Sequence, residues 1–255
     1  MFELTLRDFE DVRARIAPHI KHTPLLTSRQ LSERSGFEVR LKAEMFQRVG
    51  SYKIRGPLNK FALMPEEQKR RGVVCSSAGN HAQGVALAAH IHGIRAVVCM
   101  AENATPAKIA ATKGYGAEVV LHGTIWDEAN EKARELVERD GLTYVHPFDD
   151  LDLIAGQASL GLEIHDDWPE VDVVVVPIGG GGLISGIAIA AKSLKPGLKI
   201  VGVQAQLYPS MYNAVRNENL PMRGDTLAEG IAVKAPGQIT TKIVRELVDD
   251  ILLVT

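Results

Sequence analysis

The chain has 255 residues, of which 45% are hydrophobic and 24% are charged, and its formal net charge is -2. This composition is typical of a soluble globular protein, and the length allows one large domain or two modest ones. Charges of both signs are mixed along the chain, which excludes a basic stripe for nucleic acid. No apolar run is long enough to cross a membrane.

The N-terminal segment has acidic residues spread through it and therefore does not resemble a signal or transit peptide. The two cysteines, Cys75 and Cys99, lie in apolar strand-like runs and form no metal-type pair. We expect them to be reduced core thiols of an intracellular protein. The sequence thus predicts a cytoplasmic protein that binds neither nucleic acid nor a membrane.

The predicted elements begin in an irregular order and then alternate. The N-terminal part predicts a helix over Leu6–Ile16, a turn at Thr23-Pro24-Leu25, a helix over Ser28–Ser35 and a strand over Val39–Lys42. Strands are then expected at 72–75, 95–100, 117–121, 143–146, 171–176, 199–205 and 250–255. Helices are expected between them at 81–92, 105–115, 126–139, 154–165 and 183–194. This alternation predicts parallel sheets covered by helices, with a smaller αβ unit inserted in a larger one.

The richest segment is GGGGL at 179–183, which directly follows a predicted strand and opens a helix. Its N–H groups and the positive end of the helix dipole suit a phosphate. A tight turn needing positive φ is the plain alternative, but one or two glycines would satisfy that need. A Walker A loop would need Lys-Ser/Thr after its last glycine, and a Rossmann loop would need glycine or alanine at Ser185. Nucleotide binding is therefore disfavoured.

Two further segments carry candidate chemistry. Lys53 lies at the predicted start of a helix, where a cation is unfavourable and the neutral, nucleophilic amine is favoured. The segment SAGNHAQG at 77–84 follows a strand and opens a helix, so its N–H groups suit a carboxylate or a phosphate. Taken alone, a lysine is usually a solvated charge and the second segment a helix cap.

Taken together, SYKIRG around Lys53, SAGNHAQG and GGGGL resemble the pyridoxal 5'-phosphate (PLP) enzymes of fold type II, and most closely the threonine/serine dehydratases. The resemblance includes HTPL at 22–25, IAGQ at 154–157, GLEI at 161–164 and TLAEG at 226–230. It implies an α/β fold like that of the tryptophan synthase β-subunit, with a shortened C-terminal part. The larger PLP-binding domain is expected at 1–62 and 148–255, and the smaller substrate-loop domain at 72–147.

The resemblance also implies roles for single residues. Lys53 matches the lysine that forms a Schiff base with PLP and then moves the Cα proton. Asn80 matches the residue that binds the 3'-oxygen of the pyridine ring. The phosphate cradle is expected at Gly179, Gly180, Gly181, Gly182 and Leu183. The substrate carboxylate is expected at Ser77, Ala78, Gly79, Asn80 and His81.

Two departures from related enzymes separate the alternatives. Serine racemases of this family carry a serine before Gly-Asn-His, which protonates the opposite face of the carbanion; here Ala78 has no proton to give. Some relatives bind a divalent cation through carboxylates after the strand that ends here near Val203, but the sequence there is QAQL. We therefore expect no metal of that kind.

The resemblance implies dehydration and deamination of L-threonine and L-serine to 2-oxobutanoate and pyruvate, with release of ammonia. The alternatives are a PLP-binding scaffold with weak or no turnover and a racemase-like enzyme. Family members continue beyond the strand-like run at 250–255. Ending there is expected to leave apolar surface of the larger domain uncovered and to favour a homo-oligomer, either a dimer or a tetramer.

Overall fold

The computed structural model describes residues 5–224 and 226–255. Its helices are α1 (Leu6–Ile16), α2 (Arg29–Ser35), α3 (Arg55–Leu63), α4 (Glu66–Arg71), α5 (Asn80–Ile91), α6 (Pro106–Gly114), α7 (Trp126–Asp140), α8 (Leu151–Asp167), α9 (Gly182–Leu194), α10 (Ser210–Arg216) and α11 (Gln238–Leu247). Its strands are β1 (Leu25–Thr27), β2 (Arg40–Lys42), β3 (Val73–Ser76), β4 (Ala96–Met100), β5 (Glu118–Leu121), β6 (Thr143–Tyr144), β7 (Val173–Pro177), β8 (Lys199–Ala205) and β9 (Asp250–Val254). No helix in the described part of the chain is both long and apolar enough to cross a membrane.

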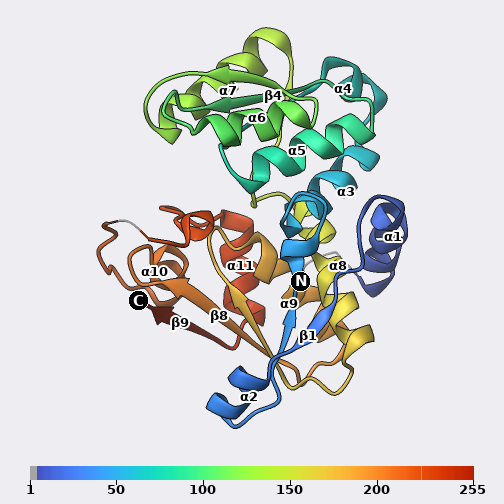
Figure 1. Cartoon of the computed structure of the whole chain (residues 1–255), viewed down its shortest axis with the longest axis vertical. Coiled ribbons are helices and arrows are strands. Elements are labelled where there is room, and N and C mark those ends of the chain that lie inside the picture. The colour runs from blue at the N-terminus through green and yellow to red at the C-terminus, as the bar shows by residue number, and fades with distance from the viewer. Residues whose placement is uncertain (1–4, 225) are drawn as a thin grey trace.

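A four-stranded parallel sheet forms the upper part of the molecule in Figure 1, with strand order β5-β4-β3-β6. The central strands β3 and β4 are buried along their whole length, as their continuous apolar sequences predict for a sheet covered on both faces. All four strands fall between residues 72 and 147. The division into a larger domain at 1–62 and 148–255 and a smaller one at 72–147 remains a prediction.

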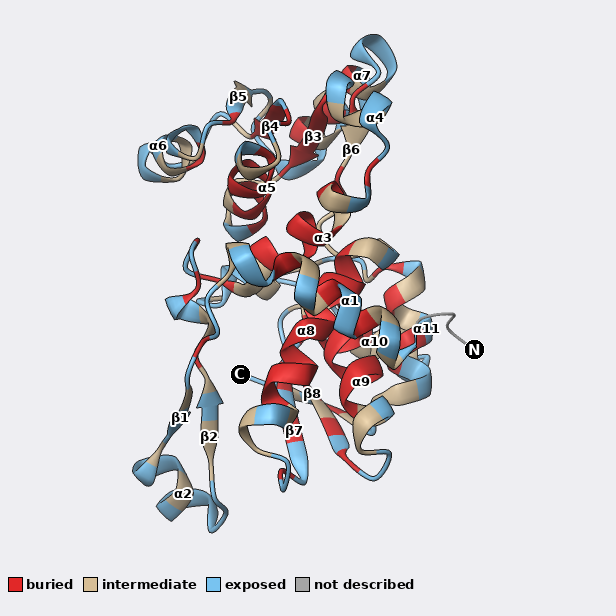
Figure 2. Ribbon diagram, turned by 90° about the vertical axis from the view of Figure 1, so that its right-hand side faces the viewer, coloured by how far each residue is buried: buried red, intermediate tan, exposed pale blue. Residues whose placement is uncertain are grey.

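A second parallel sheet, β7-β8-β9, lies in the lower part with helices α8 and α9 (Figure 1). These two helices are strongly buried (Figure 2) and pack tightly, because a Cβ added at Gly186 of α9 would lie 2.5 Å from the Ile154 oxygen of α8. The expected alternation of strands and helices, and with it the α/β class, is confirmed.

One hydrophobic core joins the two parts. It runs without interruption from α1 through α3 and α5 to α8, and its members include Phe9, Leu58, Val85 and Ile154. Helix α3 approaches α8 at two glycines, since a Cβ added at Gly156 would lie 2.5 Å from the Cα of Gly56. The segment that carries Lys53 is therefore held between the two sheets.

The outer face of the β7-β8-β9 sheet is apolar and exposed. Val173, Val175, Leu252 and Val254 lie on it, and 62% of Val175 and 50% of Leu252 are accessible to solvent. Parallel sheets are usually covered on both faces, so this surface is unusual.

The turn expected at Thr23-Pro24-Leu25 is wrong. Leu25 begins β1, which pairs with β2 as an antiparallel ribbon that extends away from the rest of the molecule with α2 (Figure 2). The Pro24 carbonyl accepts a hydrogen bond from the N–H of Ala43 at 3.0 Å. Proline favours extended backbone in the residue before it, and the partner strand extends this conformation instead of reversing it.

A buried ion network fixes the segment around Lys53. The Arg55 side chain is completely buried, and its guanidinium donates to Glu44 at 2.8 Å and to Glu163 at 2.6 Å. Lys42 pairs with the same Glu163 carboxylate at 2.8 Å. Burial alone would raise the pKa of Glu163, but the hydrogen bonds and charges of Arg55 and Lys42 hold it below its ordinary value.

We expect Arg55→Met to lower the free energy of unfolding by about 3–5 kcal/mol, because it leaves the Glu44 and Glu163 carboxylates without their shared cation. Urea unfolding followed by circular dichroism measures the change. Arg139→Met is the matched control, since Arg139 forms its ion pairs at the surface and its loss should have little effect. A stability of Arg55→Met equal to that of the control would contradict this account.

Candidate active site

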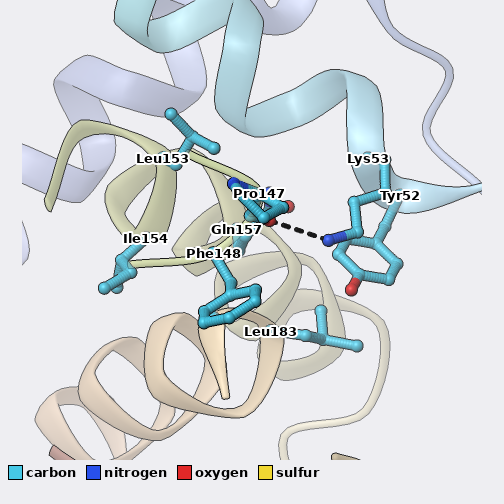
Figure 3. Close-up of a pocket in the computed structure, with 9 residues that line it drawn as sticks. Tyr52, Lys53, Pro147, Phe148, Leu153, Ile154, Gln157 and Leu183 are labelled. Carbon is cyan, nitrogen blue, oxygen red and sulfur yellow. Dashed lines mark hydrogen bonds between the residues drawn. The ribbon is translucent and has the colours of Figure 1, made fainter. Parts of the chain in front are cut away.

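Lys53 lies in a short 3-10 turn, Tyr52–Ile54, that leads directly into α3. The Ser51 hydroxyl accepts the Lys53 N–H and caps this turn. The Lys53 Nζ donates to the backbone carbonyl of Pro147 at 2.9 Å (Figure 3). This partner is a neutral carbonyl group. The structure describes no carboxylate that forms an ion pair with the Lys53 amine.

Lys53 and the end of the glycine turn line the same cavity. Its walls are Tyr52, Lys53, Pro147, Phe148, Leu153, Ile154, Gln157, Gly182 and Leu183, most of which Figure 3 shows as sticks. The enclosed space is only about 10 Å³. This is about the space of one water molecule, so the chemistry of the lining groups indicates the class of ligand that they suit and not its fit. An amine and the N-terminus of α9 facing one space suit an aldehyde that carries a phosphate.

The glycine turn offers unpaired N–H groups and cannot carry side chains. The N–H groups of Gly179 to Leu183 donate no hydrogen bond to any residue that the structure describes. Gly181 has φ +95°, and a Cβ at Gly180 would lie 2.3 Å from the Phe148 ring. Free donors at the start of a 13-residue helix are the setting that the sequence predicts to suit an anion; the role of this turn as the phosphate cradle stays a prediction.

The segment at the start of α5 lies next to the Lys53 turn. A Cβ added at Gly84, one turn into α5, would lie 2.5 Å from the Lys53 carbonyl oxygen. Asn80 is exposed at the first position of the helix, and Gly79 donates its N–H to the Ser77 hydroxyl at 3.2 Å. The helix start is therefore within reach of the space in front of Lys53.

Ser77 and Ala78 line a different and larger cavity of about 400 Å³. It lies at the carboxyl ends of β3 and β4, where Met100 and Trp126 form part of its wall, and Lys234 of the larger unit reaches it. The structure thus places the expected substrate loop between two cavities. The five expected substrate-loop residues do not share the small Lys53 cavity.

His81 is buried and neutral. Burial and the nearby Lys53 charge lower the pKa of its imidazole to about 3. Its Nε2 lies 3.1 Å from the Val145 carbonyl, which only accepts hydrogen bonds, so Nε2 carries the proton. Its Nδ1 is buried without a partner among the described residues. His81 therefore ties the start of α5 to the segment that precedes Pro147.

Gln157 supplies a second unpaired polar group. It is 4% exposed, it lines the Lys53 cavity, and its Oε1 has no hydrogen-bond partner among the described residues. A buried amide left unpaired costs about 1–3 kcal/mol. Gln157 Oε1 is therefore available to accept a hydrogen bond from a donor group bound beside Lys53.

A lysine amine and a free helix N-terminus on one cavity, within an αβ fold of two parallel sheets, define a PLP-binding enzyme of fold type II. The chain belongs to the family described as "Pyridoxal-phosphate dependent enzyme", which matches residues 16–255. The expected family and its cofactor are thereby confirmed.

Three relatives place the chain within this family. It is 48% identical to L-threonine ammonia-lyase of Thermotoga maritima, with 98% of this chain and 63% of that protein covered. Threonine deaminase isoform 2 of Solanum lycopersicum, in its processed form, has a TM-score of 0.92 and 38% identity, over 98% and 74% of the two chains. Maize serine racemase has a TM-score of 0.93 and 32% identity, over 99% and 77%. The resemblance to threonine/serine dehydratases is confirmed.

Several residues that shape the site carry no signal in the sequence. Pro147 offers only a backbone carbonyl, and Phe148 fills the space that the glycines leave. Gln157 was visible as part of the IAGQ motif, but its unpaired amide depends on the packing of α8. In the described residues no group of three or more His, Cys, Asp or Glu side chains is arranged to hold a metal ion.

Because the pKa of His81 is about 3 in the folded protein and 6.5 without its environment, the unfolded chain binds more protons between these values. The free energy of unfolding should therefore fall as the pH decreases below about 6.5. Between pH 7 and pH 5 we expect this group to account for about 2 kcal/mol, which His81→Gln should remove. Urea unfolding of the two proteins at both pH values measures the difference, with the exposed His122→Gln as control. If the free energy of unfolding depends equally on pH in His81→Gln and in the wild type, His81 is not the source of the pH dependence.

Proposed function

We propose that this chain removes the β-hydroxyl and the amino group of L-threonine, and of L-serine, to give 2-oxobutanoate or pyruvate and ammonia. The shared cavity of Lys53 and the α9 N-terminus carries the proposal, because a lysine amine and the start of a helix with free N–H groups line the same space. The activity named for the Thermotoga maritima relative and for the tomato enzyme supports this reaction. This chain spans 63% of the length of the Thermotoga maritima protein.

Each part of the site would then have one task. The N–H groups of Gly179 to Leu183 would hold the phosphate, Asn80 the 3'-oxygen, and the segment from Ser77 to His81 the substrate carboxylate. Bound PLP supplies an electron sink that stabilises negative charge at Cα. Lys53 Nζ would take the Cα proton, with Pro147 O holding the amine in position. The β-hydroxyl would leave as water together with this proton, and water would hydrolyse the resulting enamine to the oxo acid and ammonia.

Elimination is favoured over racemisation by Ala78. A racemase needs a second group to return a proton to the opposite face of Cα, and an alanine side chain cannot do so. Ser77 is the neighbouring hydroxyl; it lies one residue earlier in the loop and accepts the Gly79 N–H at 3.2 Å. A lyase needs only one proton-transferring amine at Cα, which Lys53 supplies.

We also propose that the chain acts in the cytoplasm as a homo-oligomer. The two buried free thiols, Cys75 and Cys99, support a reducing compartment. The apolar outer face of the β7-β8-β9 sheet, around Val175 and Leu252, supports association.

The direct test is an absorbance scan with PLP followed by L-threonine, with 2-oxobutanoate measured in the same sample. We expect visible absorbance from a cofactor bound through Lys53, and release of the oxo acid. Lys53→Ala should abolish both, whereas the exposed Lys113→Ala should change neither. Bound PLP without oxo acid would favour a scaffold, and D-serine formed from L-serine without pyruvate would favour a racemase.

Asn80→Ala separates alignment of the cofactor from its retention. We expect kcat to fall by about 100-fold while the Kd for PLP rises by less than about tenfold, because a tilted ring misaligns the bond that breaks. Steady-state kinetics and a PLP titration of the same preparation provide both values. Equal effects on kcat and Kd would contradict the proposed role.

A further inference from the structure

Thr240, in the first turn of α11, contacts the glycine turn through the backbone carbonyl of Gly180. Its side chain is completely buried, and its hydroxyl donates to the Gly180 carbonyl at 2.7 Å. The same carbonyl accepts the Gly237 N–H at 3.4 Å. A Cβ added at Gly181 would lie 2.8 Å from the Thr240 Cβ, so α11 packs directly against the turn.

This contact fixes the direction of the next N–H group. A trans peptide unit is planar, and its C=O and N–H point in opposite directions. With the Gly180 carbonyl turned toward Thr240, the N–H of Gly181 points away from α11. That N–H is one of the donors without a partner among the described residues. The hydroxyl of Thr240 therefore sets the direction of the Gly181 N–H, a hydrogen-bond donor suited to a phosphate, without contacting that N–H itself.

Asp149 in turn fixes the start of α11. Its carboxylate accepts the N–H groups of Gln238 at 2.9 Å, Ile239 at 2.9 Å and Thr240 at 3.1 Å. A carboxylate at a helix N-terminus is favoured by the dipole as well as by these bonds. Asp149 lies two residues after Pro147, whose carbonyl holds Lys53.

We propose that Thr240 is a positioning residue for the cofactor phosphate, acting through the Gly180–Gly181 peptide, and that Asp149 sets its position by capping α11. The proposal rests on the phosphate site proposed for Gly179 to Leu183. It does not depend on which amino acid the enzyme converts. Neither residue touches the reacting atoms, so the effect is on binding of the phosphate and not on the chemistry of the amine.

The test compares PLP with pyridoxal, which has the same aldehyde but no phosphate. The full chain, freed of cofactor, is titrated with each compound and followed by absorbance, in the wild type and in Thr240→Val. Valine keeps the volume of threonine and removes the hydroxyl. We expect the Kd for PLP to rise about tenfold and the Kd for pyridoxal to change less than about twofold.

Thr240→Ser is the matched control, because it keeps the hydroxyl and should restore PLP binding to within about twofold of the wild type. Equal weakening of PLP and pyridoxal would show a general packing role and overturn the proposal, as would an unchanged Kd for PLP. If Thr240→Val does not fold, as judged by circular dichroism, Thr240→Ala takes its place in the same comparison.

Asp149→Ala tests the second part. We expect the same selective loss of PLP binding, and an unchanged Kd for PLP would overturn the role assigned to Asp149. The proposed substrate, free L-threonine, is not added in any of these titrations. Failure of this proposal is therefore distinguishable from failure of the proposed lyase activity, which oxo-acid release reports separately.

Discussion

The hydrogen bond from Lys53 Nζ to the Pro147 carbonyl depends on a short segment, residues 146–149, that also contacts the glycine turn and the start of α11. His146 Nδ1 accepts the N–H of Asp149 at 2.8 Å and so bends the chain back on itself. Within this bend Pro147 meets Lys53, Phe148 covers the glycine turn, and Asp149 caps α11. Because these contacts come from consecutive residues, the amine and the anion site cannot shift independently.

The ion network around Arg55 has a different role. Removing Arg55, Glu44 and Glu163 from water is unfavourable, and their mutual hydrogen bonds, together with the Lys42–Glu163 ion pair, offset that loss. Arg55 follows Lys53 by two residues, so its ion pairs fix the turn from which Lys53 projects. The site is thus rigid on the side of Lys53 through charge, and on the side of the glycine turn through the Thr240 hydrogen bond.

Much of this fold follows from patterns within short stretches of the chain. Continuous apolar runs placed β3, β4 and β7, and the glycines at 179–182 marked a tight strand-to-helix turn, because each signal acts within one strand or turn. Strand β2 was predicted, but β1 and its pairing with β2 were missed, since Thr23-Pro24-Leu25 is a turn signal that only the partner strand overrides. Helices α4, α10 and α11 were also missed. Thr240 and Asp149 had no recognisable motif.

The sequence by itself determined the class of the molecule: parallel αβ units, a lysine at a helix start, and a glycine turn suited to phosphate. These are local properties of backbone freedom, helix dipoles and hydrophobic periodicity. Only the tertiary structure decided that Lys53 and Gly182 share a cavity, that Gln157 and His81 keep unpaired atoms, and that the Gly180 carbonyl is held by Thr240. Those facts depend on groups far apart in the chain, and packing alone sets the distances between them.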